Sequence, residues 1–80
     1  MADVLLPELA KDVLKAKVSF WHHEVGEAVI MGEDLVEMMT DKATFNVPVP
    51  VSGKLSSIMA KEGEEVAVGD VIAAIEEENK

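Results

Sequence analysis

The middle of the chain reads Leu35-Val36-Glu37-Met38-Met39-Thr40-Asp41-Lys42-Ala43-Thr44-Phe45-Asn46-Val47-Pro48-Val49-Pro50-Val51. Two apolar-rich segments, residues 35–39 and 45–51, flank a polar sequence at residues 40–43. From residue 43 to residue 51, apolar side chains alternate with threonine, asparagine and two prolines, which is the period of a β-strand. The stretch therefore predicts a strand directly after Lys42 and places Lys42 itself in a turn.

An internal repeat relates the two halves of the chain. Residues 18–26 align with residues 55–63 at a constant offset of 37. The pairs that match beyond these ranges are Val29 with Val66, Gly32 with Gly69 and, after a slip to an offset of 36, Asp34 with Asp70, Leu35 with Val71 and Val36 with Ile72. Two similar halves predict a quasi-two-fold domain. In such a domain the midpoint connection, which holds Lys42, lies at the opposite end from the paired termini.

Short strands joined by tight turns are the dominant local signal. Residues 14–20 alternate in the same way as residues 43–51, with apolar side chains at positions 14, 16, 18 and 20. Glycines recur at positions 26, 32, 53, 63 and 69, mostly beside acidic residues, which is typical of several short strands. Pro48 and Pro50 have no amide hydrogen to donate, so their positions must face a sheet edge or a bulge.

Three segments also have helical character, namely residues 7–14, 34–39 and 70–75. The repeat pairs the last two segments with each other, so both must have the same structure. Each of these two follows a glycine turn only a few residues after a short valine-containing run, which favours strands. We therefore expect an all-β domain, in which alternation and the repeat outweigh local helix propensity.

Composition restricts the class of protein. Eighty residues make one domain, and a chain this short buries only about 60% of the surface of its unfolded state. The net charge is −9, with seven lysines and no arginine, which argues against nucleic-acid binding because phosphate contacts need clustered cations. The absence of cysteine excludes disulfides and thiolate metal sites and fits a reducing compartment. No apolar run approaches the length of a membrane span.

Lys42 has no neighbour in the sequence that would make it a nucleophile. A nucleophilic lysine needs desolvation or a nearby cation, whereas the adjacent Asp41 favours the charged amine. If Lys42 carries chemistry, another enzyme must acylate it; in isolation, a turn lysine is a solvated charge. No Ser-His-Asp set, glycine-rich phosphate loop or isolated carboxylate pair indicates catalysis by the chain itself.

Histidine, tryptophan and methionine offer other candidate sites. His22 and His23 are neighbours, and neighbouring strand residues point to opposite faces. With no cysteine and no third histidine, we interpret them as surface residues rather than as metal ligands. Trp21 is expected to pack at the rim of the core. Four methionines are interpreted as core residues, namely Met31, Met38, Met39 and Met59.

The motif Asp41-Lys42-Ala43 has extended flanks on both sides. The flanking elements are Leu6-Pro7, Trp21 followed by Glu24, Gly26 and Val29, then Asp34-Leu35-Val36-Glu37, and Val47-Pro48-Val49-Pro50-Val51-Ser52-Gly53. With these residues the chain resembles, over nearly its whole length, a lipoyl domain, the swinging-arm module of 2-oxo acid dehydrogenase complexes. The motif alone would be weak support, but the motif, its flanks and the repeat together are specific.

The resemblance implies a flattened barrel of two four-stranded antiparallel sheets, a barrel-sandwich hybrid, over residues 1–77, with residues 78–80 beginning a linker or tail. It implies lipoic acid joined through an amide to Lys42, with Asp41 and Ala43 recognised by a lipoate-protein ligase. The domain would then be a monomeric carrier and no enzyme, free-standing or excised from an acyltransferase. Its arm would move acyl groups and reducing equivalents between a 2-oxo acid decarboxylase, an acyltransferase core and dihydrolipoamide dehydrogenase.

Two other interpretations of the same fold stay open. A biotinyl carrier has its lysine flanked by methionine on both sides, and Met38 and Met39 are out of register for that pattern. A structural or adaptor module would carry no group. Two departures from the lipoyl pattern, residues 9–12 in place of a Gly-Glu-Gly run and Met39 in place of a glutamate, bear on which complex the domain serves.

A native Met1 would indicate a prokaryotic cytoplasm, and a trimmed chain would fit the mitochondrial matrix.

Overall fold

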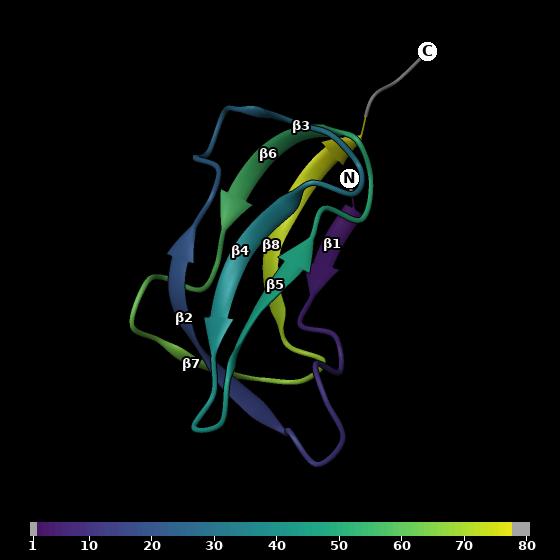
Figure 1. The fold of residues 1–80 in the computed structure, drawn as a ribbon. Coiled ribbons are helices and arrows are strands. Elements are labelled where there is room, and N and C mark those ends of the chain that lie inside the picture. The colour runs from purple at the N-terminus through teal and green to yellow at the C-terminus, as the bar shows by residue number, and fades with distance from the viewer. Residues whose placement is uncertain (1, 78–80) are drawn as a thin grey trace.

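The protein is built from eight β-strands in two four-stranded antiparallel sheets, as Figure 1 shows for the computed structural model, which describes residues 2–77. The strands are β1 (Ala2–Leu5), β2 (Lys15–Trp21), β3 (Ala28–Val29), β4 (Asp34–Met39), β5 (Thr44–Pro48), β6 (Gly53–Ile58), β7 (Glu65–Ala67) and β8 (Val71–Glu77). One sheet has the order β1-β8-β6-β3 and the other the order β5-β4-β2-β7. The described residues contain no helix, so the all-β prediction is confirmed.

The two sheets are related by the internal repeat. Replacing β1, β8, β6 and β3 by β5, β4, β2 and β7 converts one strand order into the other. The registers match as well: Val18 faces Met38 in one sheet, and Leu55 faces Ile75 in the other, each pair shifted by 37. Both β2 and β6 carry an irregularity at equivalent places, directly after Val18 and Leu55. The quasi-two-fold prediction is therefore correct at the level of individual hydrogen-bonded pairs.

The slip to an offset of 36 is wrong, because the offset of 37 continues through β4 and β8. The Asp70 carboxylate accepts a hydrogen bond from the amide of Ala67 (2.9 Å), and the Glu33 carboxylate accepts the equivalent bond from the amide of Ile30 (3.0 Å). The structural counterpart of Asp70 is therefore Glu33, and the identity of Asp34 with Asp70 is misleading. The longer Glu33 side chain closes the turn before β4, and the shorter Asp70 side chain closes the equivalent turn before β8.

The turns join the two halves directly. The amide of Gly26 donates to the carbonyl of Leu55, and the amide of Gly63 donates to the carbonyl of Val18, both at 2.8 Å. These glycines have φ of 98° and 90°, a left-handed conformation that side chains with a Cβ disfavour. Gly32 and Gly69, in the next pair of equivalent turns, have the same conformation. Four of the five glycines expected to mark turns are thus turn positions imposed by backbone geometry, whereas Gly53 begins β6.

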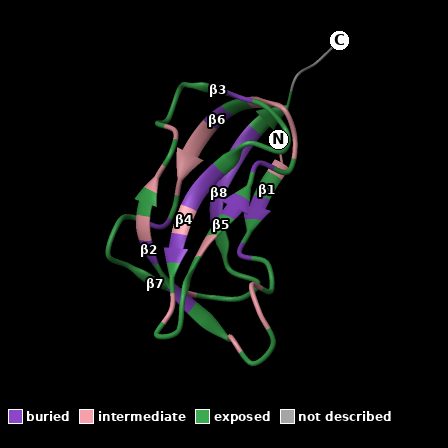
Figure 2. Cartoon of the chain, in the orientation of Figure 1, coloured by how far each residue is buried: buried purple, intermediate pink, exposed green. Residues whose placement is uncertain are grey.

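The core lies between the two sheets and is almost entirely aliphatic. Figure 2 shows burial concentrated on β4 and β8, whereas the connecting loops are mostly exposed. The largest fully buried side chains are Leu6, Leu35, Met38, Leu55, Ile72, Ile75, Val18, Val29, Val36 and Val49. No polar side chain is buried within residues 2–77. Burial of these aliphatic groups is the main driving force for joining the sheets.

Strand irregularities correct part of the expected core. The alternation of residues 14–20 puts Phe20 on the same face as Val18, yet Phe20 is exposed. The register of β2 against β4 shifts between these two residues, which turns Trp21 inward instead. Among the four methionines assigned to the core only Met38 is buried; the exposed ones are Met31, Met39 and Met59.

The remaining helix-like segments and the prolines fit the sheet. Residues 34–39 form β4, and residues 71–77 form β8. The segment from residue 6 to residue 14 is a loop, with a turn closed by a hydrogen bond from the Val13 amide to the Ala10 carbonyl (3.1 Å). Pro48 ends β5, which is an edge strand, so its missing donor costs no ladder hydrogen bond.

Lys42 and the ends of the described chain lie at opposite ends of the domain. In Figure 1 the connection from β4 to β5 is at the bottom, whereas the start of β1 and the end of β8 are at the top. This arrangement follows from the repeat. The repeat relates β4 and β5, which the midpoint turn connects, to β8 and β1, which carry the two chain ends. The prediction that residues 78–80 begin a linker falls outside the described residues. Within residues 2–77 the fold offers no apolar helix of membrane-spanning length.

Replacement of Gly63 by valine should destabilise the domain more than replacement of its exposed neighbour Glu62 by valine. No atom lies within 4 Å of a Cβ built at Gly63, so the cost comes from φ rather than from a clash. We expect a loss of about 1–3 kcal/mol for Gly63→Val. Thermal unfolding of both variants is the measurement, and equal melting temperatures would contradict the role assigned to this turn.

Candidate functional site

The turn that carries Lys42 is fixed by one threonine. It spans residues 40–43, between the terminal β4–β5 pair Met39 and Thr44. The Thr40 hydroxyl accepts hydrogen bonds from the amides of Lys42 (3.2 Å) and Ala43 (3.1 Å). It also donates to the carbonyl of Ala43 at 2.9 Å, beside the backbone bond from the Thr40 amide to the same carbonyl at 2.8 Å. The turn is therefore a closed structure that presents its two central side chains outward.

Asp41, Lys42 and Ala43 are all exposed. The Lys42 amine makes no hydrogen bond or ion pair with any described residue. Lys42 is exposed, so burial does not desolvate its amine. The structure therefore presents Lys42 as an exposed amine with no partner among the described residues.

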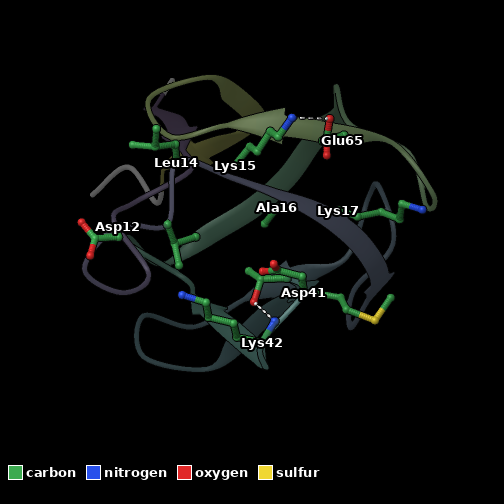
Figure 3. Close-up of a pocket in the computed structure, with 11 residues that line it drawn as sticks. Asp12, Leu14, Lys15, Ala16, Lys17, Asp41, Lys42 and Glu65 are labelled. Carbon is green, nitrogen blue, oxygen red and sulfur yellow. Dashed lines mark hydrogen bonds and ion pairs between the residues drawn. The ribbon is translucent and has the colours of Figure 1, made fainter.

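An open groove of about 630 Å³ runs beside Lys42, between the turn and the loop that precedes β2. Figure 3 shows Lys42 on one side of it and Leu14 on the other. The residues that line the groove are Asp12, Val13, Leu14, Lys15, Ala16, Lys17, Met39, Thr40, Asp41, Lys42 and Glu65. Sequence reasoning identified only the turn residues in this set.

The groove combines balanced charges with exposed apolar surface. Its charged side chains are three lysines, at positions 15, 17 and 42, and three acids, at positions 12, 41 and 65. Lys15 and Glu65 form an ion pair at 3.5 Å, and both are well exposed, so it contributes little stability. Leu14 is 77% exposed, more than any other large apolar side chain described, and Met39 is 43% exposed.

The two histidines form no metal site. His22 is exposed and hydrogen-bonded to the Asn46 side chain at 2.9 Å, as part of the surface. His23 is only half-exposed, and its two ring nitrogens face Glu27 (3.1 Å) and Glu33 (3.5 Å), which the surface assignment missed. The backbone amide of Glu24, and then His23, hold the pKa of the Glu27 carboxyl below its usual value. The described residues contain no group of side chains placed to bind a metal ion.

Trp21 has a structural role. Its indole nitrogen donates to the carbonyl of Ala60 at 2.8 Å, and its ring is half-buried against the core. This bond joins the end of β2 to the loop after β6 and confirms the expected position at the rim of the core. The polar tip of the ring is therefore already paired, as is usual for a tryptophan at such a boundary.

A family model described as "Biotin-requiring enzyme", the biotin/lipoyl model, matches residues 2–75. The chain belongs to this biotin/lipoyl attachment family. The fold of a lipoyl or biotinyl domain is that of a carrier and has no catalytic site of its own, and lipoyl domains carry lipoic acid covalently on a lysine.

The similar proteins favour the lipoyl branch over the biotinyl one. The chain is 46% identical over 74 residues to the dihydrolipoyllysine-residue succinyltransferase component of the 2-oxoglutarate dehydrogenase complex of Bartonella vinsonii subsp. berkhoffii, covering 92% of this chain and 18% of that protein. It is 40% identical over 77 residues to the acetyltransferase component of the pyruvate dehydrogenase complex of Corynebacterium glutamicum, covering 96% of this chain and 11% of that protein. The lipoyl domain thus spans less than a fifth of the length of these two relatives.

Solved structures support the same fold. The lipoyl domain of the 2-oxoglutarate dehydrogenase complex from Azotobacter vinelandii is similar with a TM-score of 0.78 at 28% identity, covering 99% of this chain and 100% of that one. The Kluyveromyces lactis urea carboxylase has a TM-score of 0.70 at 24% identity, covering 94% of this chain and 7% of that one, which shows the fold alone.

Replacement of Thr40 by valine should loosen the turn and leave the rest of the domain unchanged. The change removes the acceptor of the Lys42 and Ala43 amides, and we expect faster hydrogen exchange at both and a loss of about 1 kcal/mol of stability. Thr44→Val is the matched control, because Thr44 is exposed and its side chain makes no hydrogen bond within the described residues. Unchanged exchange at both amides in Thr40→Val would show that backbone pairing alone holds the turn.

Proposed function

We propose that Lys42 is the lipoylation site of this lipoyl domain and that Asp41 and Ala43 are read by the lipoate-protein ligase. The observation that carries the proposal is the position of Lys42: an exposed, unpaired amine in a closed turn, at the end of the barrel farthest from the described chain ends. The closed turn holds the backbone of Lys42 in one place, so a ligase meets the residue without first ordering a loop. The same position keeps the modified residue clear of whatever precedes Ala2 or follows Glu77.

When bound, lipoic acid supplies a dithiolane that accepts acyl groups and electrons. The chain contributes placement only: Thr40 holds the backbone of the turn, and the barrel holds the turn. Loss of the Lys42 charge on acylation breaks no described ion pair, so modification should leave the fold unchanged. The function is therefore group carriage, with the chemistry performed by the enzymes that the domain visits.

The partners follow from the carrier role. We propose that the domain, over residues 1–77, serves a 2-oxo acid dehydrogenase complex, with residues 78–80 beginning a linker. Its arm would visit the decarboxylase, the acyltransferase core and dihydrolipoamide dehydrogenase. The support is the likeness to acyltransferase components of such complexes, and the reported relatives are bacterial, so we propose that it acts in a bacterial cytoplasm. A net charge of −9 would favour encounter with basic surfaces on these enzymes.

Replacement of Lys42 by alanine should abolish lipoylation and leave the fold intact. An exposed turn side chain contributes little stability, so the melting temperature should stay within a few degrees of the unaltered value. Intact mass after incubation with lipoate-protein ligase and lipoic acid is the measurement. Lys54→Ala, at another exposed lysine, is the control and should be lipoylated normally. Lipoylation of Lys42→Ala would assign the attachment to a different lysine.

The biotinyl alternative predicts a different response at the same turn. Asp41 is charged and Ala43 is small, whereas a biotinyl carrier has methionine at both places. The double variant Asp41→Met with Ala43→Met should lose lipoylation and gain some biotinylation, because ligase choice depends on rejecting the wrong enzyme as well as on attracting the right one. Mass measurement with each ligase decides the outcome. If the unaltered domain accepts biotin and refuses lipoate, the lipoyl proposal is wrong.

A further inference from the structure

His23 bridges two turns of the first half, one before the short edge strand β3 and one after it. Its Nδ1 lies 3.1 Å from a carboxylate oxygen of Glu27, and its Nε2 lies 3.5 Å from a carboxylate oxygen of Glu33. Each carboxylate also closes its own turn, by accepting the amide hydrogen of Glu24 or of Ile30, both at 3.0 Å. The histidine therefore joins the two turns through their closing groups.

The protonated form of the ring is the one that fits both contacts. An ionised carboxylate accepts hydrogen bonds and donates none, so each ring nitrogen of His23 needs a hydrogen to face one favourably. A neutral imidazole carries a hydrogen on one nitrogen and would point a lone pair at the second carboxylate. The His23 side chain is 20% exposed, so solvent screens the contacts less than at an open surface. The bridge is complete when His23 carries a positive charge.

The second half of the chain has the same two turns without the bridge. The Glu64 carboxylate accepts a hydrogen bond from the Lys61 amide at 2.6 Å. The Asp70 carboxylate accepts one from the Ala67 amide at 2.9 Å. The residue equivalent to the histidine, at the offset of 37, is Ala60, which cannot bind a proton. The turns therefore close without a histidine, and the bridge is an additional link in one half.

The charges around the ring set the pH range of the bridge. Glu24, Lys61 and Glu62 line an open groove together with His23, in addition to the two bridged carboxylates. The Glu24 amide, and then His23, hold the pKa of the Glu27 carboxyl below its usual value, so this group stays charged in mild acid. An ordinary glutamate is ionised above about pH 4.3, and an ordinary imidazole is protonated below about pH 6.5. The carboxylate contribution is lost as the pH falls below this range, and the imidazolium contribution is lost as the pH rises above it.

We propose that His23 is a proton-dependent clasp, which in mild acid ties together the two turns that flank β3 and holds this strand on β6. The strand is two residues long and pairs with β6 at two positions, so its attachment depends on the turns beside it. At higher pH the neutral ring releases one turn, and β3 separates from β6 more often. The Lys42 turn lies at the other end of the barrel (Figure 1), so the clasp does not depend on the attachment site.

The first test compares the melting temperatures of Glu33→Gln and Asp70→Asn with that of the unaltered domain at about pH 5.5 and about pH 7.5, on the two sides of the imidazole titration. Both changes keep a side-chain oxygen for the turn amide and remove the charge. Glu33→Gln should melt about 2–5 °C below the unaltered domain at the lower pH and close to it at the higher pH. Asp70→Asn, in the equivalent turn without a histidine, should differ from the unaltered domain equally at both. An equal loss at both pH values in Glu33→Gln would overturn the proposal.

The two neighbouring histidines give a matched pair of variants. The unaltered domain should exceed His23→Gln in melting temperature by more at the lower pH than at the higher one. His22 is exposed, and its ring contacts the uncharged Asn46 side chain, so the effect of His22→Gln should not change between the two pH values. The same pH dependence in both variants would contradict the clasp. If His23→Gln does not fold, the comparison of Glu33→Gln with Asp70→Asn decides the question.

Hydrogen exchange locates the effect within the fold. The Leu55 amide donates to the carbonyl of Glu27 at 2.9 Å, beside β3. The equivalent Val18 amide donates to the carbonyl of Glu64 at 2.8 Å, in the half without the bridge. Protection of the Leu55 amide relative to the Val18 amide should fall about threefold or more between the lower and the higher pH. A constant ratio of the two protection factors would show that β3 is not what the histidine holds.

Discussion

The exchange of hydrogen bonds between the two halves is the constraint on which the rest of the structure depends. The amides of Gly26 and Gly63 each reach a strand of the opposite half, at Leu55 and Val18. In return, the amides of those two strand residues donate to the carbonyls of Glu27 and Glu64. Neither half can satisfy its turns or cover its apolar face without the other, because unpaired backbone groups in a core are costly. One cooperative unit of eight strands follows.

The same constraint determines where chemistry can occur. The repeat relates the strand order β1-β8-β6-β3 to the order β5-β4-β2-β7. The turn between β4 and β5 is the connection at the midpoint of the chain, and it lies on the opposite side of the barrel from the described chain ends. Thr40 closes that connection, and Lys42 extends from it with no partner among the described residues. The folded state therefore gains no described polar contact from the Lys42 side chain, and its stability does not depend on one.

Prediction from the sequence succeeded where periodicity and repetition decide the structure, and failed where a local irregularity does. Alternation put Val47 and Val49 on one face, and both are buried, but it also put Phe20 on the face of Val18, and Phe20 is exposed. A bulge after Val18 cannot be read from a two-residue period. Identity matching aligned Asp34 with Asp70, although Glu33 makes the equivalent turn bond. The role of Thr40 had a signal, since threonine hydroxyls often close turns. The placement of Leu14 in the groove had none.

The sequence by itself determined the all-β class, the two-fold arrangement of the strands and the location of Lys42 in the midpoint turn. Side-chain period and the repeat encode these features locally, residue by residue. Only the tertiary structure decided which surfaces meet: Leu14 across a groove from Lys42, and His23 between Glu27 and Glu33. The first contact follows from the pairing of β2 with β4, which brings the segment before β2 beside the turn after β4. The second joins the loops before β3 and β4. No period in the sequence records which strands pair, so the neighbours of Lys42 emerge only in the folded domain.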